Sequence, residues 1–311
     1  MIVPHPGCGG RDRRSQARAG FVLPTVLAVL VVVSGLAAAI TMRTRTAIAL
    51  SGAARDRIVL DADADGIVRV VGLWLAQEAR GRAPASRLPL DGRPIRCRLG
   101  PQRAATVAVQ DQAGLIDLNG SPRPVLEEAL RRLGAEAREA LDVAAQIVDF
   151  RDPDDVPEPN GGAEGRRYRD EGLGHGPRNA PFASPDELDQ LPAMTPALYA
   201  RFRPATTVHG AGPGFDASRM AWRLAPRLSG DALRGIMPLR PSDGLRFEVT
   251  AMVETARGAR SIRAGILALD DPARPAGAIL SWRRPTEWSG GAALPDHPAC
   301  GPIAALFGEA G

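Results

Sequence analysis

Residues 18–40 read RAGFVLPTVLAVLVVVSGLAAAI, and this stretch decides the fold. No charged side chain occurs from Phe21 to Ile40, and about 20 helical residues cover a hydrocarbon core of roughly 30 Å. The stretch is therefore predicted to cross a membrane once. Four arginines precede Phe21 and two follow closely after Ile40, so the positive-inside rule favours a cytoplasmic N-terminus.

Two interpretations of this segment are open. It could be a secretory signal peptide, with the small residues at 36–39 as its cleavage site. The apolar run is long for such a signal, however, and Gly20 meets Phe21 directly after a basic leader. This junction resembles the site of type IV prepilins, in which a peptidase cuts after the glycine and the new N-terminal residue is methylated. The resemblance implies cleavage between Gly20 and Phe21, and methylation of Phe21.

The residue five positions into the implied mature chain is Thr25. Type IV pilins usually carry Glu there, and a neutral residue is easier to insert into lipid. Among pilin-like proteins, this departure is similar to the K-type minor pseudopilins of type II secretion.

Apolar residues recur at close to a 3.6-residue period as far as Arg80. This pattern predicts a single helix from Phe21 to Arg80, about 90 Å long. Within it, Asp61, Asp63 and Asp65 imitate the start of a calcium-binding loop, but the twelfth position is a glycine without a ligand atom. We interpret the three aspartates as part of a solvated helix face.

Short alternating runs beyond the helix predict strands. Residues 87–90 and 94–99 flank Asp91-Gly92, a hairpin signal, and 106–109 form a further strand. After a glycine-rich linker at 210–214, alternation returns, and these later strands are predicted to complete the same sheet. They are 245–253, 259–269 and 278–282. The tail from Arg283 has weaker periodicity, and we expect it to be partly mobile.

The region between the two sets of strands has helical patterns and helix-start signals. The helices predicted there are 121–134, 137–150, 186–191 and 197–203. Together they predict a compact helical domain inserted between strands.

Five motifs in this region carry a specific resemblance. They are GLIDLN (114–119), IVDFRDPD (147–154), GAE (162–164) with Tyr168, NAPF (179–182) and DEL (186–188). In this order and spacing they resemble the inserted helical domain of the K-type minor pseudopilins of type II secretion, general secretion pathway protein K.

This resemblance implies an α+β, type IV pilin-like fold, in which a long N-terminal spine helix packs on an antiparallel sheet and an all-α domain is inserted. The inserted domain would be SAM-like or helix-hairpin-helix-like. The implied boundaries are a prepilin leader at 1–20, the transmembrane half of the spine at 21–40, the first part of the head at 41–110, the inserted domain at 111–209 and the C-terminal β part at 210–311.

The resemblance also implies a structural role at the tip of the pseudopilus, in its assembly and in protein export across the outer membrane. Its partners would be the I- and J-type minor pseudopilins, the major pseudopilin, the prepilin peptidase and the inner-membrane assembly platform. The chain would cross the bacterial inner membrane once, with its head in the periplasm. The alternative is a minor type IV pilin or DNA-uptake protein that uses a helix-hairpin-helix-like domain.

Carboxylates crowd the loop after residue 148. Densely placed carboxylates repel one another, and a hard cation with oxygen ligands would relieve that repulsion. Relatives of the resembled family bind calcium in their heads, so calcium is the expected cofactor. Asp152, Asp154 and Glu164 are the candidate ligands, and Asp149 could cap or pair instead. The alternative is a solvated acidic loop.

Cys97 and Cys300 remain as a pair if the leader with Cys8 is removed. An oxidising compartment would allow them to form a disulfide. The alternative is two buried thiols, because Cys97 alternates with Ile95 and Leu99 on one face of a predicted strand.

Composition and motifs argue against two other classes of protein. The chain has 39 basic against 35 acidic residues, an excess too small to indicate nucleic-acid binding, and none is expected. The turn at 191–194 lacks glycine and contains Pro192, and the acidic residues before it would repel phosphate. The sequence also has no nucleophile elbow, P-loop or zinc-ligand spacing, so we expect no enzyme.

Overall fold

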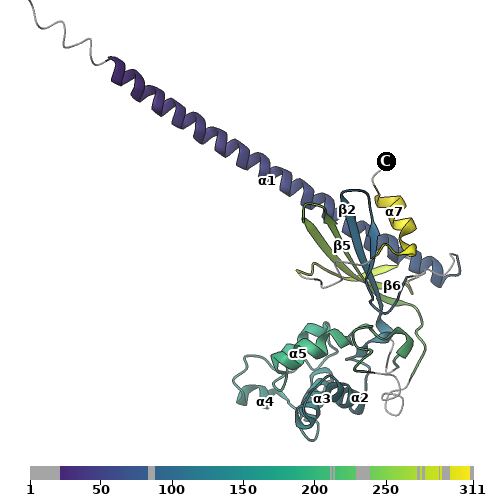
Figure 1. The fold of residues 1–311 in the computed structure, drawn as a ribbon. Helices are drawn as coiled ribbons and strands as arrows, with labels where there is room; N and C mark the ends of the chain where they lie inside the picture. The colour runs from purple at the N-terminus through teal and green to yellow at the C-terminus, as the bar shows by residue number, and fades with distance from the viewer. Residues whose placement is uncertain are drawn as a thin grey trace, which may run out of the picture. The chain divides into compact units, whose positions relative to one another are not determined.

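The computed structural model describes residues 22–82, 88–210, 212, 214–228, 239–271, 274, 277–286, 288 and 295–308. The chain divides into two compact units, Met1–Ile58 and Val59–Gly311. The first helix, α1 (Val22–Ala79), begins in the first unit and ends in the second (Figure 1). It ends one residue before the predicted end. Gly20 and Phe21 lie outside the described residues.

The first unit contributes an apolar, solvent-exposed helical segment. Every described residue from 22 to 58 is exposed, including Leu27, Val31 and Leu36. By length and composition, α1 is able to cross a membrane.

The second unit contains a five-stranded antiparallel sheet in the order β1-β2-β5-β6-β7. Its strands are β1 (Ile95–Arg98), β2 (Arg103–Asp111), β5 (Arg246–Thr255), β6 (Arg260–Ala268) and β7 (Ala278–Arg283). Val107 of β2 pairs with Ala251 of β5, so the sheet continues across the inserted segment as predicted. The α+β class, with a long N-terminal helix and an antiparallel sheet, is confirmed.

The hairpin predicted around Asp91-Gly92 is wrong, because residues 88–90 form no strand and β1 pairs with β2 instead. Asp91 forms an isolated bridge with Gln110, and the Gly92 N–H donates to the Val109 carbonyl at 2.9 Å. Asp91 and Gly92 therefore pair with the last residues of β2 and do not form the turn of a hairpin.

The C-terminal end of α1 covers one face of this sheet. Ala64, Ile67 and Val71 of the helix are fully buried in one cluster with Val107 and Val249 of the sheet. Their helical spacing places them on a single apolar stripe, which explains the packing.

Asp61, Asp63 and Asp65 of α1 do not form a solvated face, which corrects the prediction. Arg263 of β6, only 3% exposed, forms ion pairs of 2.7 Å with Asp61 and 2.8 Å with Asp65. Asp63 pairs with Arg103 of β2 at 2.5 Å. Buried charges need such partners, and the sheet supplies both arginines.

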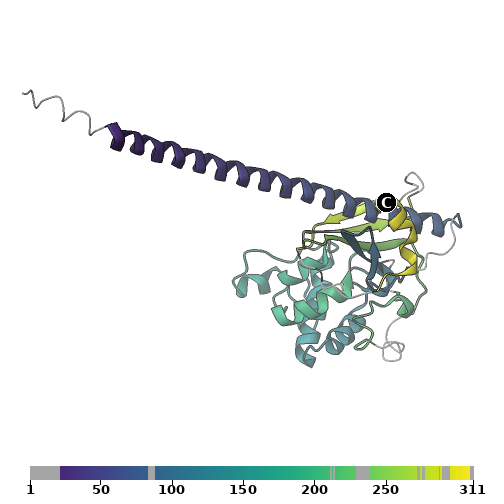
Figure 2. The same cartoon turned by 45° about the horizontal axis from the view of Figure 1, so that its top comes forward.

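A helical segment with its own core is inserted in the sequence between β2 and β5. Its helices are the teal and green ones in Figure 2. The segment contains α2 (Arg123–Arg132), α3 (Ala137–Arg151), α4 (Gly165–Asp170), the 3-10 helix η2 (Pro185–Gln190) and α5 (Pro196–Phe202). Leu126, Ile147, Phe150 and Phe202 are buried in that core. The predicted helix at 186–191 is therefore a short 3-10 helix, started by a capping box at Ser184.

Two short parallel strands, β3 (Ile116–Asp117) and β4 (Thr206–Thr207), hold the entry and exit of this segment together. Three 3-10 helices flank them: η1 (Gln112–Gly114), η3 (Arg203–Ala205) and η4 (Ala217–Arg219).

The described C-terminal residues form regular structure, which the weak periodicity did not predict. A 3-10 helix, η5 (Pro298–Cys300), leads into α7 (Gly301–Phe307). Ile303 of α7 is fully buried in the cluster that contains α1 and the sheet. Apolar contacts therefore hold α7 against the core of the sheet, a packing that the weak periodicity of this segment did not indicate.

Candidate functional site

The acidic loop begins at the last turn of α3, where Asp149 is fully buried. One carboxylate oxygen of Asp149 accepts the Glu158 N–H at 2.9 Å, and the other accepts the Ala163 N–H at 2.6 Å. These two hydrogen bonds hold the loop at residues 152–163 against the end of α3. Asp149 organises the loop through these hydrogen bonds, as its expected capping role implies.

Glycines allow the loop to lie close to α3. A Cβ atom on Gly162 would lie 2.5 Å from an oxygen of Asp149, and one on Gly161, whose φ is +123°, would lie 2.3 Å from Asp142. A side chain at either position would push the loop away from the helix.

The folded loop brings the three predicted ligands together. Asp152, Asp154 and Glu164 each place one carboxylate oxygen within 4.8 Å of the other two. Asp152 caps the end of α3, with its N–H donating to Val148, and Glu164 directly precedes α4. Asp154 is exposed, and its Oδ1 accepts the Val156 N–H at 2.9 Å.

Glu164 is the most buried of the three carboxylates, at 6% exposure. Neither of its oxygens has a hydrogen-bond partner among the described residues, and the same is true of Oδ1 of Asp152. Burial raises the pKa of Glu164 to about 7, with further contributions from Asp149 and Asp152. Burial also raises the pKa of Asp152, and the charge of Asp154 adds to this shift.

Tyr168 of α4 lies in the same environment. Its side chain is fully buried, and its hydroxyl has no hydrogen-bond partner among the described residues. Burial raises the pKa of this phenol, and the carboxylates of Glu164 and Asp149 raise it further. Sequence reasoning placed Tyr168 in a motif but gave it no role at the acidic loop.

This arrangement fits a hard cation. Three carboxylates converge on one point, the negative charges of Asp152 and Asp154 contribute to the raised pKa of Glu164, and the buried oxygens of Glu164 receive no hydrogen bond from the described residues. A divalent cation would supply the missing positive charge, and calcium accepts this kind of irregular oxygen shell. The converging carboxylate oxygens are therefore suited to binding a cation.

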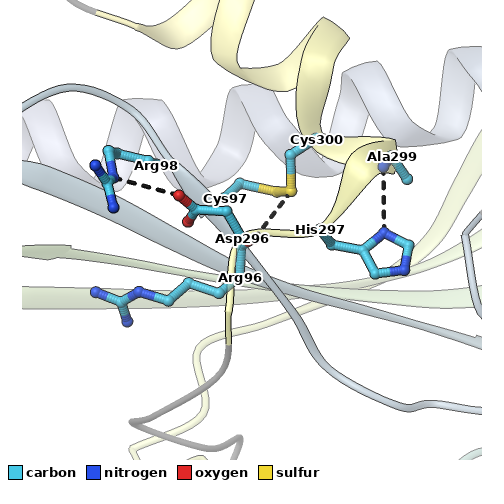
Figure 3. Close-up of a disulfide and its surroundings, with 7 residues drawn as sticks. All are labelled: Arg96, Cys97, Arg98, Asp296, His297, Ala299 and Cys300. Atoms are coloured by element: carbon cyan, nitrogen blue, oxygen red, sulfur yellow. Dashed lines mark hydrogen bonds and ion pairs between the residues drawn. A yellow bond between two sulfur atoms is a disulfide. The ribbon is translucent and has the colours of Figure 1, made fainter.

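Cys97 and Cys300 are joined by a disulfide, with Cα atoms 5.2 Å apart (Figure 3). Cys97 lies on the core face of β1 and is fully buried, as expected from its alternation with Ile95 and Leu99. Next to the disulfide, the His297 N–H donates to the Arg96 carbonyl at 3.0 Å. The bond therefore ties the start of the C-terminal helices to an edge strand of the sheet.

Comparisons with known proteins agree with the resemblance in the sequence. Residues 108–211 match the family model described as Type II secretion system (T2SS), protein K. No curated relative matches the chain.

Among solved structures, the chain is similar to one chain of the GspK-GspI-GspJ complex from the enterotoxigenic Escherichia coli Type 2 Secretion System. The TM-score is 0.57 at 15% sequence identity, and the match covers 79% of this chain and 100% of that chain. This likeness concerns the fold. Residues 108–211 are therefore similar to type II secretion system protein K, within a chain whose fold is similar to that of one chain of the GspK-GspI-GspJ complex.

Proposed function

We propose that the chain is a K-type minor pseudopilin that acts structurally at the tip of the type II secretion pseudopilus. There it would support pseudopilus assembly and protein export across the outer membrane. The observation that carries this proposal is the protein K match, which covers the helical segment inserted into a sheet-and-helix head. The role requires shape and contacts and no catalysis.

The inserted segment supports a tip position on steric grounds. It adds four α-helices and a separate core to the head. A subunit inside a pseudopilus must leave room for the neighbour above it, whereas a terminal subunit need not. A large insertion is thus compatible with the end of the fibre.

The anchor supports a single pass through the bacterial inner membrane, with the head in the periplasm. The exposed apolar residues of α1 would lie in lipid before assembly. The prepilin peptidase would cut between Gly20 and Phe21, and Phe21 would be methylated. The mature helix would then join the major pseudopilin and the inner-membrane assembly platform.

The partners closest to the tip would be the I- and J-type minor pseudopilins. The test is co-purification of the full-length chain, extracted in mild detergent, with tagged I- and J-type proteins from the same genome. We expect a ternary complex that survives size-exclusion chromatography. Elution of the chain apart from both partners would contradict the tip role, provided that the same preparation retains its native melting transition.

Calcium is the proposed cofactor of the acidic loop, with Asp152, Asp154 and Glu164 as ligands. Support comes from their convergence within 4.8 Å and from the buried oxygens of Glu164, which accept no hydrogen bond from any residue that the structure describes. Bound calcium would hold the loop between α3 and α4 in place and so stabilise the helical segment.

Three observations argue against the DNA-uptake alternative. Residues 185–190 form a 3-10 helix and not the first helix of a helix-hairpin-helix. Pro192 removes an amide donor from the following turn. Asp186 forms a 2.7 Å ion pair with Arg203, so this arginine is already paired with a carboxylate and is less available to a phosphate group.

A further inference from the structure

Asn179 lies beside the acidic loop, in the segment between α4 and η2. Its side-chain amide nitrogen donates to the Asp154 carbonyl at 3.1 Å and to Oδ1 of Asp155 at 3.1 Å. These two acceptors fix which end of the amide is the nitrogen, because an oxygen in its place would face two other oxygens. The side-chain oxygen of Asn179 therefore points away from both acceptors.

This oxygen is buried and has no hydrogen-bond partner among the residues that the structure describes. Buried polar atoms in proteins are nearly always paired, so an unpaired one commonly marks the place of a water molecule or an ion. The two carboxylate oxygens of Glu164 and Oδ1 of Asp152 are in the same state. Unpaired buried oxygens thus come from both sides of α4, from the acidic loop before it and from the segment after it.

The position of Asn179 is fixed by the core of the helical segment. Phe182, three residues later, stacks on Phe150 of α3 with ring centres 4.4 Å apart. Its N–H donates to the side-chain oxygen of Asn119 at 2.7 Å, and its carbonyl accepts from the Asn119 amide at 3.0 Å. Asn179 is therefore held against the acidic loop by contacts that need no ion.

The other carboxylates of the loop already have partners. Both oxygens of Asp149 accept backbone N–H groups, Glu158 pairs with Arg123 at 2.9 Å, and Asp155 accepts from Asn179. The three convergent carboxylates together also exceed the charge of a divalent cation, so a fourth carboxylate would add repulsion. A further ligand from the chain should therefore be a neutral oxygen.

We propose that the side-chain oxygen of Asn179 is a fourth protein ligand of the cation at the three convergent carboxylates. Calcium takes about six to eight oxygen ligands, and the side-chain carbonyl of asparagine is one of its usual ligands. The acidic loop and the segment before η2 would then be joined at one ion, and Phe182 would connect this junction to the core. Asn179 would complete the oxygen shell without adding negative charge.

This inference rests on the proposed calcium site and adds one residue to it. It does not depend on the tip role. The experiment is therefore chosen so that the wild type tests the calcium site and the variants test Asn179.

The experiment is isothermal titration calorimetry of calcium chloride into the full-length chain, in detergent and after treatment with chelator. Asn179→Gly removes the ligand atom, and glycine accepts the φ of +49° at this position without strain. We expect its calcium dissociation constant to rise by about tenfold or more. Asn160→Gly is the matched control, because Asn160 is exposed and has a φ of +61° in the acidic loop. It should bind calcium as the wild type does.

A second variant separates coordination from a purely structural role of the amide. Asn179→Asp keeps an oxygen at this position and loses the N–H donors to Asp154 and Asp155. We expect it to recover most of the affinity that Asn179→Gly loses. Its melting temperature should also depend on calcium more strongly than that of the wild type, because a further carboxylate then lies in the cluster.

Three results would overturn the proposal and leave the calcium site standing. Unchanged affinity in Asn179→Gly would mean that the oxygen is not a ligand. Equal losses in Asn179→Gly and Asn179→Asp would mean that the amide acts only through its N–H groups. An equal loss in Asn160→Gly would mean that a looser loop backbone weakens the site. A wild type without any calcium response, in calorimetry or in melting, would overturn the calcium site together with this inference.

Discussion

Glu164 determines the electrostatics of the acidic loop. Its folded-state pKa is about 7, above the ordinary value of 4.5, so the metal-free folded chain binds the proton more tightly than the unfolded chain. Stability from this group is therefore fully present below pH 4.5 and is lost as the pH rises through 7. The loss amounts to at most about 3 to 4 kcal/mol, because one pKa unit corresponds to about 1.4 kcal/mol.

The first prediction concerns Glu164→Gln, which keeps the side-chain shape and removes the charge. At pH 7.5 without calcium, this variant should melt at a higher temperature than the wild type, since the buried charge is gone. With calcium, the wild type should gain stability and the variant should gain far less. Differential scanning fluorimetry of the full-length chain in calcium and in chelator measures both effects.

The control for this prediction is Glu171→Gln, a change at an exposed residue in an ion pair with Arg167. It should retain the calcium response. A melting temperature of the wild type that chelator does not change would contradict the metal site.

Gly114 is required because its backbone lies directly against the backbone of Arg219. A Cβ atom at this position would lie 1.9 Å from the carbonyl oxygen of Arg219, which has no room to move without shifting the chain after η4. We predict that Gly114→Ala destabilises the protein by about 1–3 kcal/mol through this backbone displacement.

Urea unfolding of the full-length chain measures the effect of Gly114→Ala. Gly174→Ala is the matched control, because a Cβ atom there would meet nothing within 4 Å. Equal stability of the two variants would disprove the requirement at Gly114.

At the level of secondary-structure elements, α1 and the sheet are joined by charges as well as by apolar packing. Arg263→Met would leave Asp61 and Asp65 without their buried partner. We predict a loss of about 2 kcal/mol in unfolding free energy, less than for a fully buried pair because the side chain of Asp65 is 37% exposed.

Arg260→Met, at an exposed position on the same strand, should have little effect. Adding Asp61→Asn and Asp65→Asn to Arg263→Met should restore part of the stability, since no charge would then be left unpaired. Destabilisation by Arg263→Met that the two asparagines do not relieve would contradict the ion-pair explanation.

The disulfide connects η5 and α7 to β1 across a sequence separation of 203 residues. A cross-link over so long a loop restricts the unfolded chain, and the entropic estimate of its stabilisation is about 5 kcal/mol. We predict that Cys300→Ser lowers the melting temperature and exposes the C-terminal helices to limited proteolysis first.

Intact mass of the proteolytic fragments shows which end is cut. The wild-type protein, with the disulfide intact, is the control. Identical proteolysis of the Cys300→Ser and wild-type proteins would contradict the anchoring role of the disulfide.

Elements with local signals could be predicted from the sequence, whereas contacts between distant segments could not. The period of α1 and the alternation of β5 and β6 are properties of short windows, and the structure places these elements within a few residues of their predicted bounds. The pairing of Asp61 with Arg263 depends on strand register some 200 positions later in the chain, so the sequence suggested a solvated face instead.

The same distinction holds for the two sites. Asp152, Asp154 and Glu164 lie in one loop, and their crowding was visible in the sequence, although calcium binding remains a prediction. A hollow on the sheet face away from α1 is lined by residues from 91 to 288, and no local pattern indicated it. The sequence also did not predict helix α7, because its seven residues are too few for a clear periodic signal.

On the scale of the whole molecule, the cleavage position in the N-terminal segment decides whether the head stays attached to a membrane-spanning helix. A signal peptide cut after residue 39 would release a soluble head, whereas a prepilin cut after Gly20 would keep the apolar residues of α1 attached to it. The length of α1, which continues from Val22 into the sheet cluster without interruption, favours the second outcome. Cleavage within the helix would remove the segment that is apolar enough to cross a membrane.

We therefore predict that the mature chain begins at Phe21 and carries one methyl group on its N-terminal nitrogen. Intact-mass spectrometry of the membrane-extracted protein, from cells that contain the prepilin peptidase, should show loss of residues 1–20. Gly20→Val should retain the leader, because a branched side chain would block the cleavage position, whereas Gly10→Val in the same leader should be processed normally. A mature chain that begins at any other residue, or processing of Gly20→Val, would rule out the prepilin mechanism and with it the route by which this head would enter a pseudopilus.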